Sequence, residues 1–176
     1  IQKSYEGGYE HYENELHERL KKGELLSTNS IHSADSLNFK TPGGKIVYGG
    51  GGIMPDEFVA MDTTGSSVYY GDVNSRGLIN QFAYNYLDKN RSAFEKFKTF
   101  DEFNSQFTTN DQIFDQFLSF AGKNGVPLDD KGANISGGII RVQIKALIAR
   151  QIWKNDGVYP VVHTLDVALR KALNMV

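Results

Sequence analysis

The chain has 176 residues, of which 40% are hydrophobic and 23% are charged, and its formal net charge is −2. These values match globular proteins and exclude a wholly disordered chain. The near-neutral charge, with no stripe of lysine and arginine, argues against nucleic acid as a partner. The chain contains no cysteine, so it forms neither disulfides nor thiolate metal sites.

The sequence contains no apolar run near the roughly 20 residues of a transmembrane helix, so we expect no membrane span in this chain. It also shows no signal peptide. The first residue is Ile1 instead of methionine. We therefore expect a piece of a longer or processed chain, whose leader would lie out of view.

The first predicted element is a helix over residues 9–22. Apolar residues recur at helical spacing from Tyr9 to Leu20, and Glu15 precedes Arg19 by four residues, which is the favourable order for an ion pair. Gly23 stands where a C-terminal helix glycine is expected. The opposite face is strongly charged, which indicates that the helix lies on the surface of a larger structure.

Residues 37–62 are typical of β structure. Leu37-Asn38-Phe39 alternates, Thr41-Pro42-Gly43-Gly44 predicts a turn, and Lys45-Ile46-Val47-Tyr48 resumes with β-branched and aromatic residues. Glu57-Phe58-Val59-Ala60-Met61 is a third candidate strand. So small a β unit is marginal alone, so we expect it to need the helices downstream or a sheet from elsewhere in the parent protein.

From Asp72 onward, apolar residues recur at the helical period and predict a bundle of about five helices. The stripes are Ile79, Phe82, Ala83, Tyr86 and Leu87; Phe97, Phe100, Phe103 and Phe107; Ile113, Phe114, Phe117, Leu118 and Ala121; Ile140, Ile144, Leu147 and Ile148; and Leu165, Ala168, Leu169, Ala172 and Leu173. At this spacing the phenylalanines indicate core more than a binding platform. Trp153 is expected to anchor the last two helices.

Local signals divide this helical half. Three capping boxes are predicted, at Ser92…Glu95, Thr99…Glu102 and Thr109…Gln112. Turn residues predict breaks at 123–127 and at Asn155-Asp156-Gly157.

The stretch Thr63-Thr64-Gly65-Ser66-Ser67 interrupts the pattern, so we expect a boundary between Thr63 and Gly71. The predicted fold class is α+β, with a small β unit followed by a mainly α-helical C-terminal domain. The predicted domains are residues 1–65, with the helix and the β strands, and residues 66–176, with the helical bundle.

The run Gly49-Gly50-Gly51-Gly52 suggests a phosphate-binding loop, but its context does not fit one. A P-loop ends in Gly-Lys-Ser or Gly-Lys-Thr, and a dinucleotide-binding turn leads directly into a helix. Here the glycines lead into Ile53-Met54-Pro55-Asp56. We interpret them as a bulge or a close backbone approach and predict no cofactor.

Other candidate sites lack the spacing that their chemistry needs. His11 and His17 are six residues apart, which does not place them on one helix face, and neither His32 nor His163 stands in a metal motif. Ser66-Ser67 has no base nearby in sequence and lies in no nucleophile motif. We predict no catalytic, cofactor-binding or metal-binding residue within this chain.

The densest motif of the chain is Thr41-Pro42-Gly43-Gly44-Lys45-Ile46-Val47-Tyr48-Gly49-Gly50-Gly51-Gly52-Ile53-Met54-Pro55-Asp56. It resembles the C-terminal processing, or tail-specific, serine peptidases. The resemblance extends to further segments on both sides. These are Ile1-Gln2-Lys3-Ser4-Tyr5, Gly23-Glu24-Leu25, Phe39-Lys40, Asp62-Thr63, residues 144–151, and Asp166 with Lys171-Ala172-Leu173.

The resemblance implies a hydrolase that cleaves proteins near their C-termini with a serine nucleophile and a lysine base. In that family both residues precede the glycine-rich motif, and no lysine here matches the catalytic one. The chain is therefore expected to be the C-terminal, non-catalytic portion of such a peptidase, inactive alone. Protein or peptide substrates would bind through the catalytic part, and the resemblance implies a location in the cell envelope or periplasm. The alternative is a stand-alone interaction or dimerisation module, with a homo-oligomer as one possible outcome.

Overall fold

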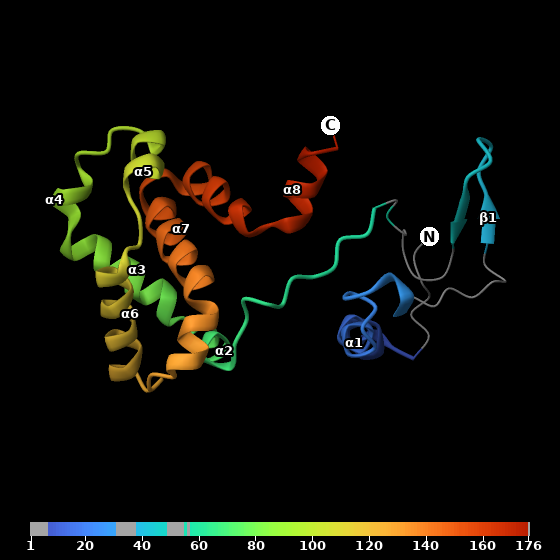
Figure 1. Cartoon of the computed structure of the whole chain (residues 1–176), viewed down its shortest axis with the longest axis horizontal. Helices are drawn as coiled ribbons and strands as arrows, with labels where there is room; N and C mark the ends of the chain where they lie inside the picture. Colours follow the sequence, from blue (N-terminus) through green and yellow to red (C-terminus); the bar gives the residue numbers. More distant parts are fainter. Residues whose placement is uncertain (1–6, 31–37, 49–54, 56, 176) are drawn as a thin grey trace. The chain divides into compact units, whose positions relative to one another are not determined.

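The computed structural model describes residues 7–30, 38–48, 55 and 57–175. The structure is mostly helical, with one two-stranded sheet and a helical C-terminal region. Contacts divide it into two compact units, Ile1–Asp62 and Thr63–Val176, which are described separately (Figure 1).

In the first unit, α1 spans Tyr9–Lys21, close to the predicted helix. Gly23 follows it with a φ of +78°, a left-handed conformation that glycine adopts without strain. The Nε atom of Arg19 donates to the carboxylate of Glu24 at 2.9 Å, and a short 3₁₀ helix, η1, covers Thr28–Ser30. The predicted helix and its glycine end are confirmed.

The predicted hairpin is also confirmed. Strand β1, Asn38–Lys40, pairs antiparallel with β2, Ile46–Tyr48, in a register that places Phe39 opposite Val47. In the turn, the Gly44 amide donates to the Thr41 carbonyl at 2.9 Å, and Gly44 has a φ of +85°. Pro42 at the second turn position fixes φ in the range that this turn requires.

The third predicted strand, Glu57–Met61, is wrong. This segment is irregular, and the Met61 amide donates to the Leu25 carbonyl at 2.9 Å. A strand needs a neighbour that pairs with successive backbone groups, and in the described part of this unit β1 and β2 pair with each other alone. Its run of apolar residues therefore has no sheet to join.

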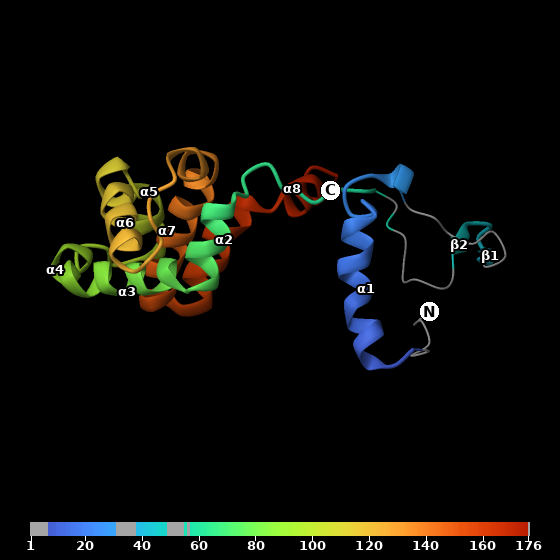
Figure 2. The same ribbon diagram turned by 90° about the horizontal axis from the view of Figure 1, so that it is seen from below.

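The second unit is built around the long helix α7 (Figure 2). Helices α2, α3 and α5 contact α7, and α6 contacts α3. The elements are α2 Val68–Ser75, α3 Leu78–Lys89, α4 Arg91–Phe94, α5 Phe100–Gln106, α6 Asp111–Lys123, α7 Asp130–Val162, the 3₁₀ helix η3 His163–Leu165, and α8 Val167–Leu173.

The described core lies between Tyr69 and Val161, within the second unit. The phenylalanine row is core as predicted, because Phe97 and Phe103 are buried and Phe100 and Phe107 pack against them. The ring centroids of Phe103 and Trp153 lie 5.1 Å apart, which joins α5 to α7.

One of the three predicted caps is confirmed. The Thr99 hydroxyl accepts from the Glu102 amide at 3.2 Å and begins α5. Ser92 instead lies inside α4, and α6 is capped by Asn110, whose side-chain oxygen accepts from the Ile113 amide at 3.0 Å. The prediction at Thr109 is wrong because its buried hydroxyl donates to the Arg141 carbonyl on α7.

The chain changes direction within α7 (Figure 1). The kink is at Lys154, whose φ of 57° and ψ of −133° are not helical. The predicted turn at Asn155-Asp156-Gly157 is wrong in position, because those residues are helical and the break comes just before them. The break predicted at 123–127 is confirmed, because α6 ends at Lys123 and Gly125 has a φ of +85°.

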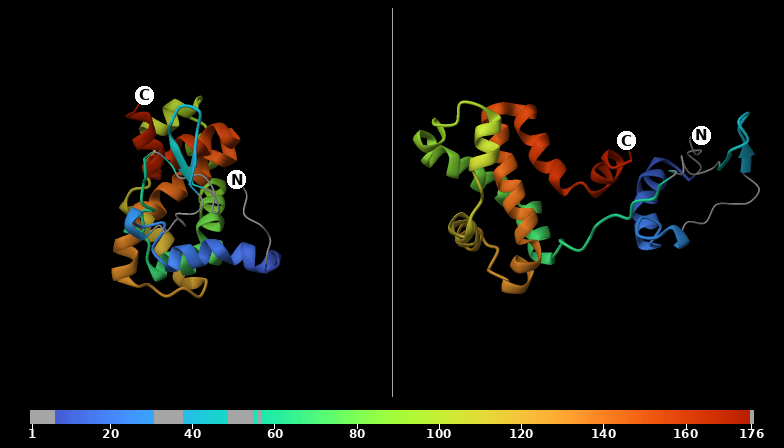
Figure 3. Two further views of the ribbon diagram at one scale, coloured as in Figure 1. Left: turned by 90° about the vertical axis from the view of Figure 1, so that its right-hand side faces the viewer. Right: turned by 45° about the horizontal axis from the view of Figure 1, so that its top comes forward.

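Beyond the kink, η3 and α8 lead away from α7 (Figure 3, right). The last predicted stripe forms these elements but contributes no buried residue, and Leu173 remains 68% exposed. The stripe correctly predicts a helix, whereas its burial depends on a partner surface that the described residues do not supply.

Candidate functional site

Ser67, one of the two serines weighed as nucleophiles, has a structural role. The Ser67 hydroxyl accepts from the Tyr70 amide at 3.1 Å and donates to the Gly132 carbonyl at 3.0 Å. The fully buried Ser136 donates to Ser67 at 2.8 Å. These bonds cap α2 and attach it to α7, and no basic side chain takes part in them. Ser67 is therefore the N-cap of α2.

The described histidines belong to no group of metal-ligating side chains. His11 and His17 are exposed on α1, and His163 stacks on Tyr159 in the other unit, with ring centroids 5.8 Å apart. His32 lies outside the described residues. Within the described ranges, no group of three or more potential ligand side chains is placed to hold a metal ion.

The glycine-rich motif is described only in part. Residues 41–48 provide the turn and strand β2 of the hairpin, and Pro55 is exposed. Gly49–Met54 and Asp56 lie outside the described residues. The hairpin exposes apolar side chains on both faces. Phe39 and Val47, on one face, are 49% and 39% exposed, and Ile46, on the other, is 57% exposed.

Lys145 on α7 is a partly buried cation. Its ammonium donates to the Asn104 carbonyl at 2.7 Å and lies 5.8 Å from the centre of the Phe103 ring. Burial lowers the pKa of Lys145, because removal from water disfavours the charged form. Its bond to a backbone carbonyl fixes the end of α5 against α7, which is a structural role.

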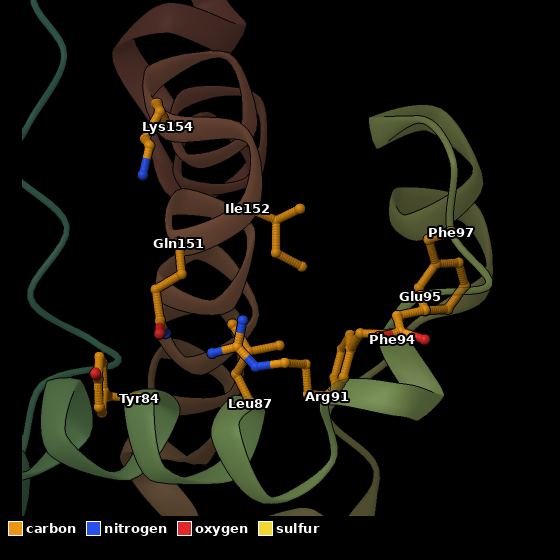
Figure 4. Close-up of a pocket in the computed structure, with 9 residues that line it drawn as sticks. All are labelled: Tyr84, Leu87, Arg91, Phe94, Glu95, Phe97, Gln151, Ile152 and Lys154. Atoms are coloured by element: carbon orange, nitrogen blue, oxygen red, sulfur yellow. The ribbon is translucent and has the colours of Figure 1, made fainter.

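The second unit contains a pocket of about 520 Å³ between α3, α4 and α7 (Figure 4). This volume is within the roughly 300–1,000 Å³ of small-ligand pockets. Its apolar base is formed by buried side chains, and Ile152 contributes a further apolar surface from α7. The lining residues are Tyr84, Leu87, Arg91, Phe94, Glu95, Phe97, Gln151, Ile152 and Lys154.

Charged groups surround this apolar base. Figure 4 shows the Arg91 side chain directed toward α7, with Glu95 near Phe97 on the opposite side. Lys154 lies further along α7, and its side chain is on the side of the helix away from Arg91. Lys154 is also the kink residue of α7, and its positive φ is the sole non-glycine case in the described residues. Such backbone strain costs about 1–3 kcal/mol and is concentrated at functional sites.

Sequence reasoning missed this pocket. Its residues come from α3, α4, the segment that follows α4, and α7, and no functional motif joins them in the sequence. The nearest local signal was the turn composition of Asn155-Asp156-Gly157, which directly follows Lys154. That signal indicated a break in the helix. The break lies at the edge of a pocket only because α3 and α4 lie close to α7 in space.

Comparison with known proteins gives one match. Residues 69–154 are similar to a family of unknown function (DUF8443), and this range includes every residue that lines the pocket. Neither the curated proteins nor the solved structures contain a match to the chain. In the described residues, no helix has the length and apolar character needed to cross a membrane.

Proposed function

We propose that this chain is the C-terminal, non-catalytic portion of a tail-specific serine endopeptidase of the cell envelope. The observation that carries the proposal is the glycine-rich motif, whose residues 41–48 provide the turn and strand β2 of a hairpin with apolar groups exposed on both faces. The first unit would complete the protease core, and the helical unit would be an accessory domain. The serine and lysine of the reaction belong to the part that precedes the motif in that family.

The physical argument concerns the isolated hairpin. Two strands of three residues are at best marginally stable in water. Covering Phe39, Val47 and Ile46 with a larger sheet and its flanking layers would add about 25 cal/mol for each Å² of apolar surface removed from water. A hairpin that is apolar on both faces suits such a position better than an exposed one.

The proposal is tested by proteolysis of an unfolded protein substrate. The chain alone is compared with a form extended upstream to include the family's serine and lysine. We expect cleavage by the extended form only, and its loss when that serine is changed to alanine. Cleavage by the chain alone, or none by the extended form with its catalytic residues in place, would contradict the proposal.

A second measurement tests the role of the hairpin itself. Phe39→Ser should lower the midpoint of unfolding of the extended form and leave that of the present chain unchanged. Val68→Ser is the matched control, because Val68 is 81% exposed on the helical unit. Equal effects of Phe39→Ser on both forms would show that the hairpin does not join a larger sheet.

The alternative function is a stand-alone interaction or dimerisation module. Its dimerisation form is favoured by η3 and α8. Leu165 and Leu173 are 38% and 68% exposed, and Leu169, between them at helical spacing, is only partly buried. Such a row buries its apolar surface when two copies pack α8 against α8. Sedimentation analysis should then show a dimer that Leu173→Lys dissociates, whereas a monomer at all concentrations would exclude this function.

A further inference from the structure

The pocket between α3, α4 and α7 has an aromatic base whose rings are held by other rings. Phe94 and Phe97 are 7% and 8% exposed, and their ring centroids lie 6.1 Å apart. The Phe94 ring also contacts Phe107 at a centroid distance of 5.1 Å, and the Phe97 ring meets Phe103 edge-on at 5.6 Å. A ligand that packs on Phe94 and Phe97 therefore does not have to order them.

Ile152 supplies a second apolar surface, from α7. Figure 4 shows its side chain projecting from α7 toward the segment that carries Phe97. Ile152 is 38% exposed, so part of its apolar surface is in contact with water. A flat apolar body that enters the pocket would remove apolar surface from water on Ile152 and on the two rings at the same time.

Arg91 places a cation beside the aromatic base. It precedes Phe94 by three residues in α4, which puts both side chains on one face of this helical turn. Arg91 pairs with Asp88 at 3.3 Å, but their side chains are 69% and 64% exposed, so this contact is weak and leaves guanidinium donors available. The planar guanidinium group binds a carboxylate through two parallel hydrogen bonds.

The charges of the lining favour an anion and give it an orientation. Among the lining residues, Arg91 and Lys154 are cations and Glu95 is the one anion, so positive charge is in excess. Lys154 contributes only to the field, because its side chain is on the side of α7 away from Arg91. Glu95, near Phe97, repels a carboxylate from that end of the pocket. An anionic group is therefore best placed at Arg91, with its apolar body toward Phe97.

We propose that this pocket binds a small aromatic carboxylate, in which the acid group is attached to a rigid ring system. The carboxylate pairs with Arg91, the rings lie on Phe94 and Phe97, and Ile152 covers part of the opposite face. Apolar pockets with a few placed polar groups are the usual form of a specific site for a small molecule. The proposal is independent of the peptidase assignment, because no residue of the first unit lines the pocket.

The aromatic base favours a ring system over a fatty acid, which also joins a carboxylate to an apolar body. Contact between aromatic rings contributes free energy beyond that of the apolar area it buries. An alkyl chain also loses conformational freedom when it is ordered in a pocket, whereas a fused ring system has little to lose. A fatty acid of similar size should therefore bind more weakly.

The test is isothermal titration calorimetry on the full chain with three ligands of similar size. They are β-naphthoate, its neutral amide and the straight-chain acid decanoate. We expect saturable binding of β-naphthoate at one site. The amide should bind about tenfold more weakly, because it makes no charge-assisted hydrogen bond with Arg91. Decanoate should bind about fivefold more weakly, because it is flexible and has no ring to pack on Phe94.

Variants locate the ligand and separate binding from folding. Arg91→Gln should weaken binding of β-naphthoate about tenfold and abolish its advantage over the amide, because the two changes remove the same interaction. Ile152→Ser should weaken binding of β-naphthoate and of the amide equally, by about fivefold, since it removes apolar contact only. Lys89→Gln is the matched charge control, because Lys89 is exposed near Arg91 in sequence but does not line the pocket. It should leave the affinity unchanged.

The thermal unfolding midpoints of Arg91→Gln and Ile152→Ser should stay close to that of the wild type, because both side chains are partly exposed. Equal binding of β-naphthoate and its amide would overturn the proposal, as would affinities that neither Arg91→Gln nor Ile152→Ser changes. Decanoate binding as tight as that of β-naphthoate would assign the pocket to an alkyl acid instead. Absence of saturable binding of β-naphthoate up to its solubility limit would also contradict the proposal. None of these measurements depends on proteolytic activity, so failure here leaves the peptidase proposal unaffected.

Discussion

At the scale of single residues, adjacent tyrosines on α2 have opposite environments. Tyr69 is buried, and its hydroxyl has no hydrogen-bond partner among the described residues. The Tyr70 hydroxyl accepts from the Gln143 side-chain amide at 2.6 Å. A buried polar group without a partner loses its bonds to water and gains none in return.

We predict that Tyr69→Phe raises the free energy of unfolding by about 1 kcal/mol, because it removes an unpaired hydroxyl and keeps the ring. Tyr70→Phe is the matched control and should lower it by about 1 kcal/mol, since it leaves the Gln143 amide without its acceptor. Urea denaturation measures both. A loss of stability in Tyr69→Phe would show that its hydroxyl is in fact paired.

The same residue predicts a dependence on pH. Burial, assisted by the Asp129 carboxylate, raises the pKa of Tyr69 above its ordinary value of 10.0. The unfolded chain then loses the phenol proton at a lower pH than the folded chain. Stability contributed by this group is therefore complete below pH 10.0 and is lost as pH rises toward the folded-state pKa.

The free energy of unfolding of the wild type should accordingly fall more steeply above pH 10 than that of Tyr69→Phe. Burial also raises the pKa of Tyr86, and this effect is common to both proteins and cancels in the comparison. Parallel pH profiles from 8 to 11 would show that Tyr69 ionises equally easily in both states.

At the scale of elements, the kink in α7 brings Gly157 close to the backbone of Ala149. A Cβ atom added at Gly157 would lie 2.6 Å from the Ala149 carbonyl oxygen and 3.0 Å from the Trp153 Cβ atom. The first contact is with backbone, which cannot move aside without disturbing the helix. Gly138, on the same helix, would meet no atom within 4 Å.

We predict that Gly157→Ala destabilises the protein by about 2 kcal/mol or more, because the two parts of α7 on either side of the kink must move apart to relieve the clash. Gly138→Ala should stabilise it by about 0.5–1 kcal/mol, since alanine is the better helix former. Thermal unfolding of the two variants checks the pair. Similar effects of the two substitutions on stability would indicate that the kink of α7 does not bring Gly157 against Ala149.

At the scale of the whole molecule, the two units differ in what holds them together. The buried hydrophobic residues of the described chain lie in the helical unit, whereas the first unit contains α1, η1 and the hairpin without a buried residue among those described. Cooperative unfolding needs a shared apolar core. The helical unit should therefore account for the unfolding transition of the chain.

Residues 63–176 alone are predicted to unfold with the urea midpoint of the full chain. Residues 1–62 alone should show no cooperative transition. Circular dichroism at 222 nm follows both. A shift of the midpoint on removal of the first unit would demonstrate that the units stabilise each other, and a sharp transition in residues 1–62 would reveal a core of their own.

The sequence by itself determined the features that depend on local spacing. Helix α1 with Gly23, the hairpin with its Pro42 turn, the break after Lys123 and the buried phenylalanine row follow from periodicity and backbone preference, which act within a few residues. The glycine-rich motif, which carries the proposed peptidase function, is a sequence feature as well.

Only the tertiary structure decided how distant residues combine. Thr109 looked like a cap in sequence but bonds the Arg141 carbonyl, and Ser136 reaches Ser67 across 69 positions of the chain. The segment 57–61 had a strand pattern and no strand to pair with. The pocket arises because α3, α4 and the kink at Lys154 meet in space, and packing of distant helices leaves no local pattern in a single chain.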